Sequence, residues 1–241
     1  MMEDLEKATV DYQSNYDGSQ EEPTVLPSAF PNFLVNGGTG IAVGMATNMA
    51  PHNLGEIIDG VCAQIDNPQI TIPELMKFVK GPDFPTGGMI CGIEGIKNYF
   101  HTGRGSVKMR ATASIEETRR GGYQIVVTEL PYQTSCSSIA GRIQELVDAG
   151  ELDGISDVND GSAGGQTELV VTLKRDANAN VVLNNLFKLT SLQTSFGVNM
   201  VALVDGVPRT LNLVTALQGY IRHQVEVVTR RTQFRLDKAQ K

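Results

Sequence analysis

Between residues 89 and 211 the sequence switches repeatedly between two hydrophobic periods, and this switching constrains the fold more than any other feature. Alternating apolar and polar residues predict half-buried strands, whereas apolar residues three or four apart predict helices. The predicted strands are 89–91, 106–115, 123–130, 154–158, 168–174, 198–204 and 209–211, and the predicted helices are 93–100, 138–149 and 180–189. This order predicts an α+β fold, in which a mixed or antiparallel sheet carries helices packed on one face.

The last segment, residues 212–241, predicts one long helix, because it contains no proline and Gly219 is its only glycine. A helix of about 29 residues would be roughly 45 Å long at 1.5 Å per residue. Residues 2–12 also have a helical pattern, and neither segment shows a capping signal at its outer end. We therefore expect the sequence to be a piece of a longer chain.

Two further helices are predicted closer to the N-terminus. A helix is predicted over residues 53–65, which starts at Asn53 and places apolar side chains on one face. Residues 71–80 open with a capping box, in which Thr71 and Glu74 satisfy each other's backbone N–H groups. Ahead of both helices, three prolines enforce extended backbone over residues 23–31.

Composition places the chain among ordinary globular proteins, with 41% hydrophobic and 20% charged residues in a length of 241. Its apolar runs are strand-sized, well short of the roughly 20 residues of a membrane helix, and its N-terminus is acidic rather than apolar. Cys62, Cys91 and Cys136 are widely spaced and form no CxxC pair. We therefore expect a cytoplasmic protein with reduced core thiols, without a membrane segment or a metal site.

Charge is distributed unevenly along the chain, and the distribution says more than the net charge of -7. The first 24 residues carry one basic and seven acidic side chains, which gives -6. Residues 96–120 carry six basic and two acidic side chains, which gives +4, and residues 206–241 carry seven and two, which gives +5. A polyanion such as DNA would be met by these local basic stretches rather than by the average.

The glycine-rich residues 33–45 superficially resemble a dinucleotide-binding fingerprint. The spacing from Gly38 through Gly40 to Gly44 is G-x-G-x-x-x-G rather than G-x-G-x-x-G, and Pro51 interrupts the position of the phosphate-binding helix. The structural alternative is a close-packed strand and turn, in which small residues admit another backbone.

Local chemistry gives no sign of an active site. The sequence contains no Walker motif, no G-x-S-x-G and no HExxH. Asp157 and Asp160 lie near each other, and we expect them to be solvated rather than to form an acid–base pair.

The basic residues are the most usable signal for function. Arg104 lies between Gly103 and Gly105, while Lys108 and Arg110 share one face of a predicted strand. This pattern is compatible with a strip that contacts phosphates, and equally with a solvated strand face. A second basic set lies on the C-terminal helix and could be a DNA-facing stripe or a solvated coiled-coil face; its members are Arg222, His223, Arg230, Arg231 and Arg235.

Nine segments together identify a family resemblance that spans nearly the whole chain. They are residues 31–48 (PNFLVNGGTGIAVGMATN), 51–54 (PHNL), 81–86 (GPDFPT), 102–105 (TGRG), 131–133 (PYQ), 174–177 (KRDA), 182–186 (VLNNL), 195–203 (SFGVNMVAL) and 228–232 (VTRRT). The first closely resembles the signature of the DNA-cleavage subunits of bacterial type IIA topoisomerases. The later ones resemble the A subunit of DNA gyrase more than its topoisomerase IV homologue.

The resemblance implies a domain organisation. In that family a winged-helix domain carries the nucleophilic tyrosine and is followed by a tower domain and a long coiled coil. Residues 1–22 would then be the end of the winged helix and a connector, 23–207 the tower, and 208–241 the start of the coiled coil. The catalytic tyrosine context is absent from all six tyrosines of this chain, which are Tyr12, Tyr16, Tyr99, Tyr123, Tyr132 and Tyr220.

The resemblance also implies a wedge. In the family an isoleucine within this Gly-Ile-Ala-Val-Gly motif is inserted between base pairs and bends the duplex, and the matching residue is Ile41. An apolar wedge on a tight turn is physically suited to entering a base step. The alternative is that Ile41 belongs to the core. The expected DNA-binding residues are Ile41, Arg104, Lys108, Arg110, Thr39 and His52, with no catalytic and no metal-binding residue in the chain.

The implied partners and cofactors belong to a larger enzyme. The resemblance predicts double-stranded DNA, a B subunit that supplies ATP and Mg²⁺ chemistry, and a second A subunit in an A2B2 assembly. The whole would be an ATP-dependent, supercoiling isomerase, and this chain alone would cleave nothing. Two rival classes are a nucleotide-dependent oxidoreductase, which would bind a cofactor at residues 38–44, and a purely structural dimerisation element, which would show no salt-dependent DNA binding.

Overall fold

The computed structural model describes residues 1–118 and 121–240, and the chain divides into two compact units. Unit 1 comprises Met1–Pro82, Asn98–Arg104 and Val198–Lys241, and unit 2 comprises Asp83–Lys97 and Gly105–Gly197. Within the described residues, no helix is both long and apolar enough to cross a membrane.

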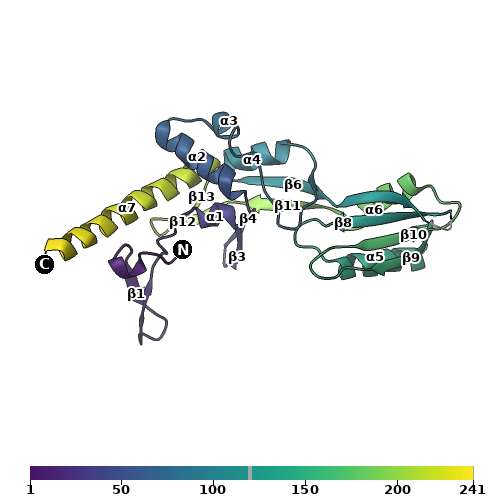
Figure 1. The fold of residues 1–241 in the computed structure, drawn as a ribbon, viewed down its shortest axis with the longest axis horizontal. Coiled ribbons are helices and arrows are strands. Elements are labelled where there is room, and N and C mark those ends of the chain that lie inside the picture. Colours follow the sequence, from purple (N-terminus) through teal and green to yellow (C-terminus); the bar gives the residue numbers. More distant parts are fainter. Residues whose placement is uncertain (119–120, 241) are drawn as a thin grey trace. The chain divides into compact units, whose positions relative to one another are not determined.

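Unit 1 combines short strand pairs with helices that are distant in sequence (Figure 1). Its N-terminal elements are the 3-10 helix η1 (Leu5–Lys7), β1 (Tyr12–Ser14), β2 (Glu21–Pro23), α1 (Asn32–Val35), β3 (Gly38–Ala42), β4 (Met45–Met49), α2 (Leu54–Asp66) and α3 (Ile72–Leu75). Its C-terminal elements are β12 (Val201–Val204), β13 (Val207–Thr210) and α7 (Leu213–Gln240).

The core of unit 1 forms where α2 and α3 pack against the first turns of α7. The Asn53 side chain caps α2 by accepting from the Glu56 N–H, and α2 then buries Ile57 and Val61. Leu217 of α7 is fully buried beside Gly60, where an added Cβ would lie 3.0 Å from Val79 Cγ2 and 3.5 Å from Leu217 Cδ1. The predicted helices at 53–65 and 212–241 are therefore confirmed, the latter over its described residues.

Unit 2 contains a four-stranded antiparallel sheet with strand order β7-β8-β10-β9. Its elements are β7 (Thr112–Glu117), β8 (Tyr123–Glu129), α5 (Cys136–Asp148), β9 (Ile155–Asp160), β10 (Leu169–Leu173) and α6 (Ala179–Leu189), together with β5 (Met89–Ile90). Three further elements contain residues of both units: α4 (Glu94–Thr102), β6 (Arg104–Arg110) and β11 (Gln193–Asn199).

Both α5 and α6 cover the same face of this sheet. Ile125 lies opposite Val171 in the register, so the two side chains point to one face. They share one buried cluster with Ile143 of α5 and Leu186 of α6. The predicted α+β class, with antiparallel strands, helices on one face and a long C-terminal helix, is confirmed.

Four sequence predictions about elements need correction. Residues 2–12 form only η1 and the start of β1, because Asp4 and Ala8 have positive φ values that interrupt a helix. The helix predicted to reach Lys80 ends at Leu75. Residues 106–115 form two strands rather than one, because the N–H of Ala111 bonds to Leu192 O at 2.8 Å between them.

The fourth correction concerns the strand predicted at residues 198–204. It is divided between β11 and β12, and Met200 separates the two by donating its N–H to Gly103 O at 2.8 Å. The turn predicted at residues 119–122 joins β7 to β8, with Glu117 opposite Tyr123, although Arg119 and Arg120 lie outside the described residues. The three cysteines are free thiols, but Cys62 is exposed, so it is no core residue.

Candidate nucleic-acid interface

The hairpin formed by β3 and β4 carries highly exposed aliphatic side chains of unit 1. The strands pair from Gly38 opposite Met49 to Ala42 opposite Met45. Val43 and Gly44 make the two-residue connection, in which Gly44 has a φ of +79° that favours glycine. Near this tip, Val43 is 101% exposed, Ile41 90% and Met45 43%.

The two faces of the hairpin differ. Ile41 lies opposite Ala46 and shares its face with Thr39, whose hydroxyl donates to Asn48 Oδ1 at 2.9 Å. The other face is anchored to the protein, because Thr47 Oγ1 donates to Asn199 O at 3.2 Å and Met49 is buried. The geometry therefore turns Ile41 and Thr39 away from the anchor.

The exposure of Ile41 contradicts the alternative that it is a core residue. A fully exposed isoleucine forgoes the roughly 1.5–3 kcal/mol that burial of such a side chain contributes. The structural alternative was that the glycines near Ile41 let another backbone segment pack closely against them. A methyl group added at Gly38 or Gly44 would instead have no described atom within 4 Å. Only Gly37, at the base of the hairpin, is tightly packed, with 2.4 Å between an added Cβ and Met49 O.

The hairpin geometry also bears on the dinucleotide alternative. Residues Gly38–Ala42 and Met45–Met49 are antiparallel strands, whereas a dinucleotide fingerprint needs a strand, a tight turn and then a helix N-terminus. The phosphate-binding helix end therefore has no counterpart at residues 38–49.

His52 does not lie on a surface that DNA could touch. It is 3% exposed and bonds through Nδ1 to Leu34 O and through Nε2 to the Tyr99 hydroxyl, both at 2.9 Å. Its ring also stacks on Phe100. Both ring nitrogens are satisfied inside unit 1, so a direct DNA contact by His52 stays a prediction that this geometry does not support.

Arg104 opens β6 and its residue is exposed, as a phosphate-contacting side chain requires. The adjacent Gly103 does admit a close backbone, but the partner is internal. A Cβ at Gly103 would lie 2.2 Å from Leu211 O, and Gly103 O accepts from the Met200 N–H. Gly103 therefore lets two backbone segments of unit 1 pack closely, and it is not needed for a ligand to come near.

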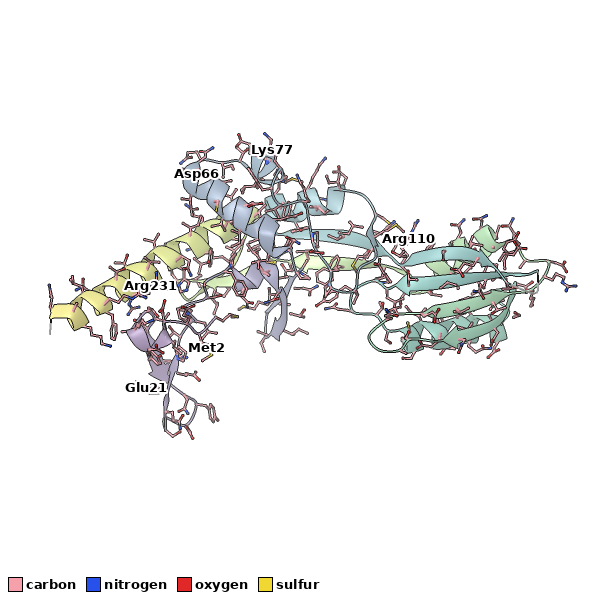
Figure 2. All side chains as sticks on the ribbon, in the orientation of Figure 1. Met2, Glu21, Asp66, Lys77, Arg110 and Arg231 are labelled. Atoms are coloured by element: carbon pink, nitrogen blue, oxygen red, sulfur yellow. The ribbon has the colours of Figure 1, made fainter. Side chains whose placement is uncertain are left out.

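Lys108 and Arg110 share one face of β6 within unit 2, yet they differ in availability. Lys108 is exposed. Arg110, labelled in Figure 2, donates through Nε and Nη2 to Gln193 Oε1 at 2.9 and 2.6 Å, and its guanidinium lies 4.7 Å from the centre of the Phe187 ring. Arg110 would have to exchange these contacts for a phosphate.

Three of the basic residues of α7 form ion pairs within unit 1. Arg230 pairs with Asp11 at 2.6 Å and Arg231, labelled in Figure 2, pairs with Asp4 at 2.8 Å. Arg222 pairs with Asp205 at 3.1 Å. These ion pairs join the acidic N-terminal segment and the β12–β13 turn to the basic helix.

Asp4 is the most perturbed carboxylate in these pairs. Hydrogen bonds from Arg231 and Lys7 lower the pKa of Asp4 from 3.8 to about 2. The residue is 6% exposed and adopts a φ of 69°. It is therefore held as a carboxylate where the N-terminal segment meets α7.

The structure also places the acidic residues that the sequence analysis singled out. Asp157 and Asp160 are exposed on β9, as predicted for solvated carboxylates. Among residues 1–118 and 121–240, no group of three histidine, cysteine or acidic side chains could hold a metal ion.

Sequence reasoning missed Val43, Met45 and Tyr99. The first two share the exposed hairpin tip with Ile41. The sequence did contain a signal for a hairpin: the two residues Val43 and Gly44 lie between segments of small and β-branched residues. The contact between Tyr99 and His52 spans 47 residues and has no local signal.

Unit 1 therefore presents an anchored hairpin with an exposed apolar tip, and exposed basic residues lie on the α+β framework of the described residues. A family model for the A subunit of DNA gyrase/topoisomerase IV matches residues 1–241. The chain belongs to this family.

The similar curated proteins are DNA gyrase A subunits. The chain is 53% identical over 240 residues to that of Halalkalibacterium halodurans, covering 100% of this chain and 29% of that protein. It is 52% identical over 239 residues to that of Clostridium acetobutylicum, covering 99% and 29%, and 52% identical over 240 residues to that of Staphylococcus aureus strain MRSA252, covering 99% and 27%. The chain thus spans less than a third of the length of these relatives.

Proposed function

We propose that this chain is the DNA-binding and DNA-bending part of a gyrase A subunit, with Ile41 as the wedge that enters a base step. The observation that carries the proposal is the 90% exposure of Ile41 on an anchored hairpin. A soluble protein exposes isolated apolar side chains routinely, but Ile41, Val43 and Met45 cluster at a projecting turn. Of these three residues, Ile41 shares a hairpin face with Thr39 and is the one proposed to insert between bases.

The energetics of a wedge are compatible with this arrangement. Unstacking a base step costs about a few kcal/mol, and the bent duplex offsets this by wrapping more protein surface. Burial of Ile41 between bases recovers the apolar transfer energy that the free protein forgoes. Thr39, on the same hairpin face, and the exposed Arg104 and Lys108 are the proposed polar and phosphate contacts.

The cutting chemistry is proposed to lie outside this chain. None of its tyrosines stands in the sequence context of the family nucleophile, and burial raises the pKa of both Tyr99 and Tyr220. A raised pKa disfavours the phenolate that would attack a phosphate. We therefore expect the 241-residue chain alone to cleave no DNA.

In the complete enzyme, this chain would act within an A2B2 assembly, together with ATP-binding B subunits and a second A subunit. That assembly would pass one duplex through a transient break in another and introduce negative supercoils. Mg²⁺ and ATP are assigned to the B subunit. The tower domain is proposed at residues 23–207, with 1–22 as connector and 208–241 as the start of the coiled coil.

Bending of a duplex of about 30 base pairs, labelled for energy transfer at both ends, tests the proposal. We expect the wild-type chain to shorten the end-to-end distance and Ile41→Ala to abolish most of that change. Val43→Ala, which trims a second exposed residue of the same hairpin, is the matched control. Equal bending by wild type and Ile41→Ala would overturn the wedge.

Binding measured by anisotropy at several salt concentrations tests the phosphate contacts separately. Loss of one phosphate contact in Arg104→Ala should make the slope of log affinity against log salt shallower by about 1. Lys77→Ala, at an exposed site that follows α3, is the control. Absence of binding by the wild-type chain would assign the DNA grip to another part of the complete protein.

A further inference from the structure

We propose that His52 and Tyr99 form a positioning pair that fixes the base of the β3–β4 hairpin and thereby sets the direction in which Ile41 projects. This inference rests on the proposed role of Ile41 in DNA bending. It assigns His52 and Tyr99 to positioning rather than to contact with DNA.

His52 links the two chain segments at the base of the hairpin. The chain enters the hairpin through Leu34 and Val35 and leaves it at His52. The His52 N–H donates to Val35 O at 3.1 Å, and its ring bonds to Leu34 O through Nδ1 at 2.9 Å. One residue thus ties the leaving strand to the entering segment.

Tyr99 connects this tie to a separate element. It lies on α4, is fully buried, and its hydroxyl is 2.9 Å from His52 Nε2. The adjacent Phe100 is also fully buried and stacks on the His52 ring at a centroid distance of 6.1 Å. The hairpin base is therefore fixed against a packed helix rather than only against itself.

The hydrogen-bond roles in this chain of contacts are determined by chemistry. The carbonyl of Leu34 only accepts, so Nδ1 of His52 must carry the proton. In a neutral ring Nε2 then accepts, and the Tyr99 hydroxyl must donate to it. Burial raises the pKa of Tyr99 well above 10.0, which keeps this hydroxyl protonated and able to donate.

The hairpin has a second anchor at the middle of β4. Thr47 donates to Asn199 O, and the Asn199 side chain donates to Ala46 O at 2.6 Å. Contacts at two separate points fix the orientation of the hairpin, whereas a contact at one point would let the hairpin rotate about it. Loss of the Tyr99 hydrogen bond should therefore let the hairpin turn about Asn199 and blur the position of Ile41.

Tyr99→Phe is the sharpest test, because it removes one oxygen and keeps the buried ring. We expect its melting temperature to stay close to that of the wild type, while amide hydrogen exchange at residues 38–49 becomes about fivefold faster, as loss of one hydrogen bond allows. In the energy-transfer assay, Tyr99→Phe should lose about half of the bending and keep the wild-type salt slope. Tyr16→Phe, the same change at a fully exposed site, is the control.

Combining Tyr99→Phe with Ile41→Ala separates positioning from a general structural role. If Tyr99 acts through Ile41, the double variant bends DNA no less than Ile41→Ala alone. Additive losses would overturn the inference, as would unchanged exchange at residues 38–49. Faster exchange with unchanged bending in both Tyr99→Phe and Ile41→Ala would instead contradict the proposed function while leaving the hairpin anchor established.

The tautomer of His52 gives a spectroscopic test that needs no DNA. Nitrogen NMR of the ring should show a protonated Nδ1 and an accepting Nε2, and Tyr99→Phe should shift the Nε2 resonance. A ring protonated at Nε2 would contradict the assignment. His52→Asn, whose amide can still donate to Leu34 O but which loses the stack on Phe100, should loosen residues 38–49 at least as much as Tyr99→Phe.

Discussion

Ile125 and Ile41 are the same residue type in the same kind of secondary structure, and the protein treats them in opposite ways. Ile125 of β8 is fully buried between the unit 2 sheet and its helices, whereas Ile41 of β3 is 90% exposed. In unit 2 the alternation of the strands turns apolar side chains toward α5 and α6. In the β3–β4 hairpin the same alternation turns Ile41 away from the anchored face. The difference separates residues that hold the fold from residues available to a partner.

The largest expected effect is loss of the buried member of this pair. Ile125→Ala should lower the free energy of unfolding by about 2–5 kcal/mol, because it removes apolar contacts and leaves a cavity in a packed cluster. Urea unfolding of the variant and the wild type measures the difference. A loss below about 1 kcal/mol would contradict the burial assigned to Ile125.

A glycine at the hairpin base should be the next most sensitive position. Gly37→Ala should cost about 1–3 kcal/mol, because Gly37 has a φ of +66° and the new methyl would collide with Met49 O. Gly44→Ala, at a φ of +79° in open space, should cost only about 1 kcal/mol. Unfolding measurements that rank the two variants in the opposite order would contradict the tight base and open tip.

Acid should weaken the attachment of the N-terminal segment to α7. The pKa of Asp4 is lowered in the folded protein from 3.8 to about 2. The Asp4 carboxylate therefore contributes its full stabilisation at pH values above 3.8, and this contribution is lost as the pH falls through about 2. Arg231→Met should flatten this part of the stability profile, measured by urea unfolding between about pH 5 and pH 2. Arg235→Met, at an exposed site on the same helix, is the control, and identical profiles for both variants would contradict the role of the Arg231–Asp4 pair.

The smallest expected effect on stability belongs to Ile41 itself. Ile41→Ala should change the free energy of unfolding by less than about 0.5 kcal/mol, because the side chain gives up almost no burial. Thermal unfolding beside the Ile125→Ala variant measures the contrast directly. A large destabilisation would return Ile41 to the core and remove the basis of the comparison.

The sequence predicted the elements that depend on local periodicity. The α2, α5, α6 and α7 helices and the antiparallel strands of unit 2 follow from the spacing of apolar residues. The proposed role of Ile41 came from family resemblance, since an isoleucine among glycines could equally have been buried.

Pairings between distant residues could not be predicted. Arg110 meets Gln193, which is 83 residues away, and Arg231 meets Asp4, which is 227 residues away. The pairing of His52 could not be predicted either: the family resemblance suggested a DNA contact, whereas its partner Tyr99 lies 47 residues away on α4. Burial and pairing of polar residues thus depend on tertiary contacts that no short segment encodes.

Unstacking of a base by Ile41 is the central claim, and a fluorescent base analogue at the centre of a short duplex reports it directly. Binding of the wild-type chain should raise the fluorescence of the analogue as its base step opens, and Val43→Ala should preserve most of that rise. Ile41→Ala should bind with the same salt slope and leave the analogue quenched. An equal rise with Ile41→Ala would show that the base step opens without this side chain and would contradict the wedge.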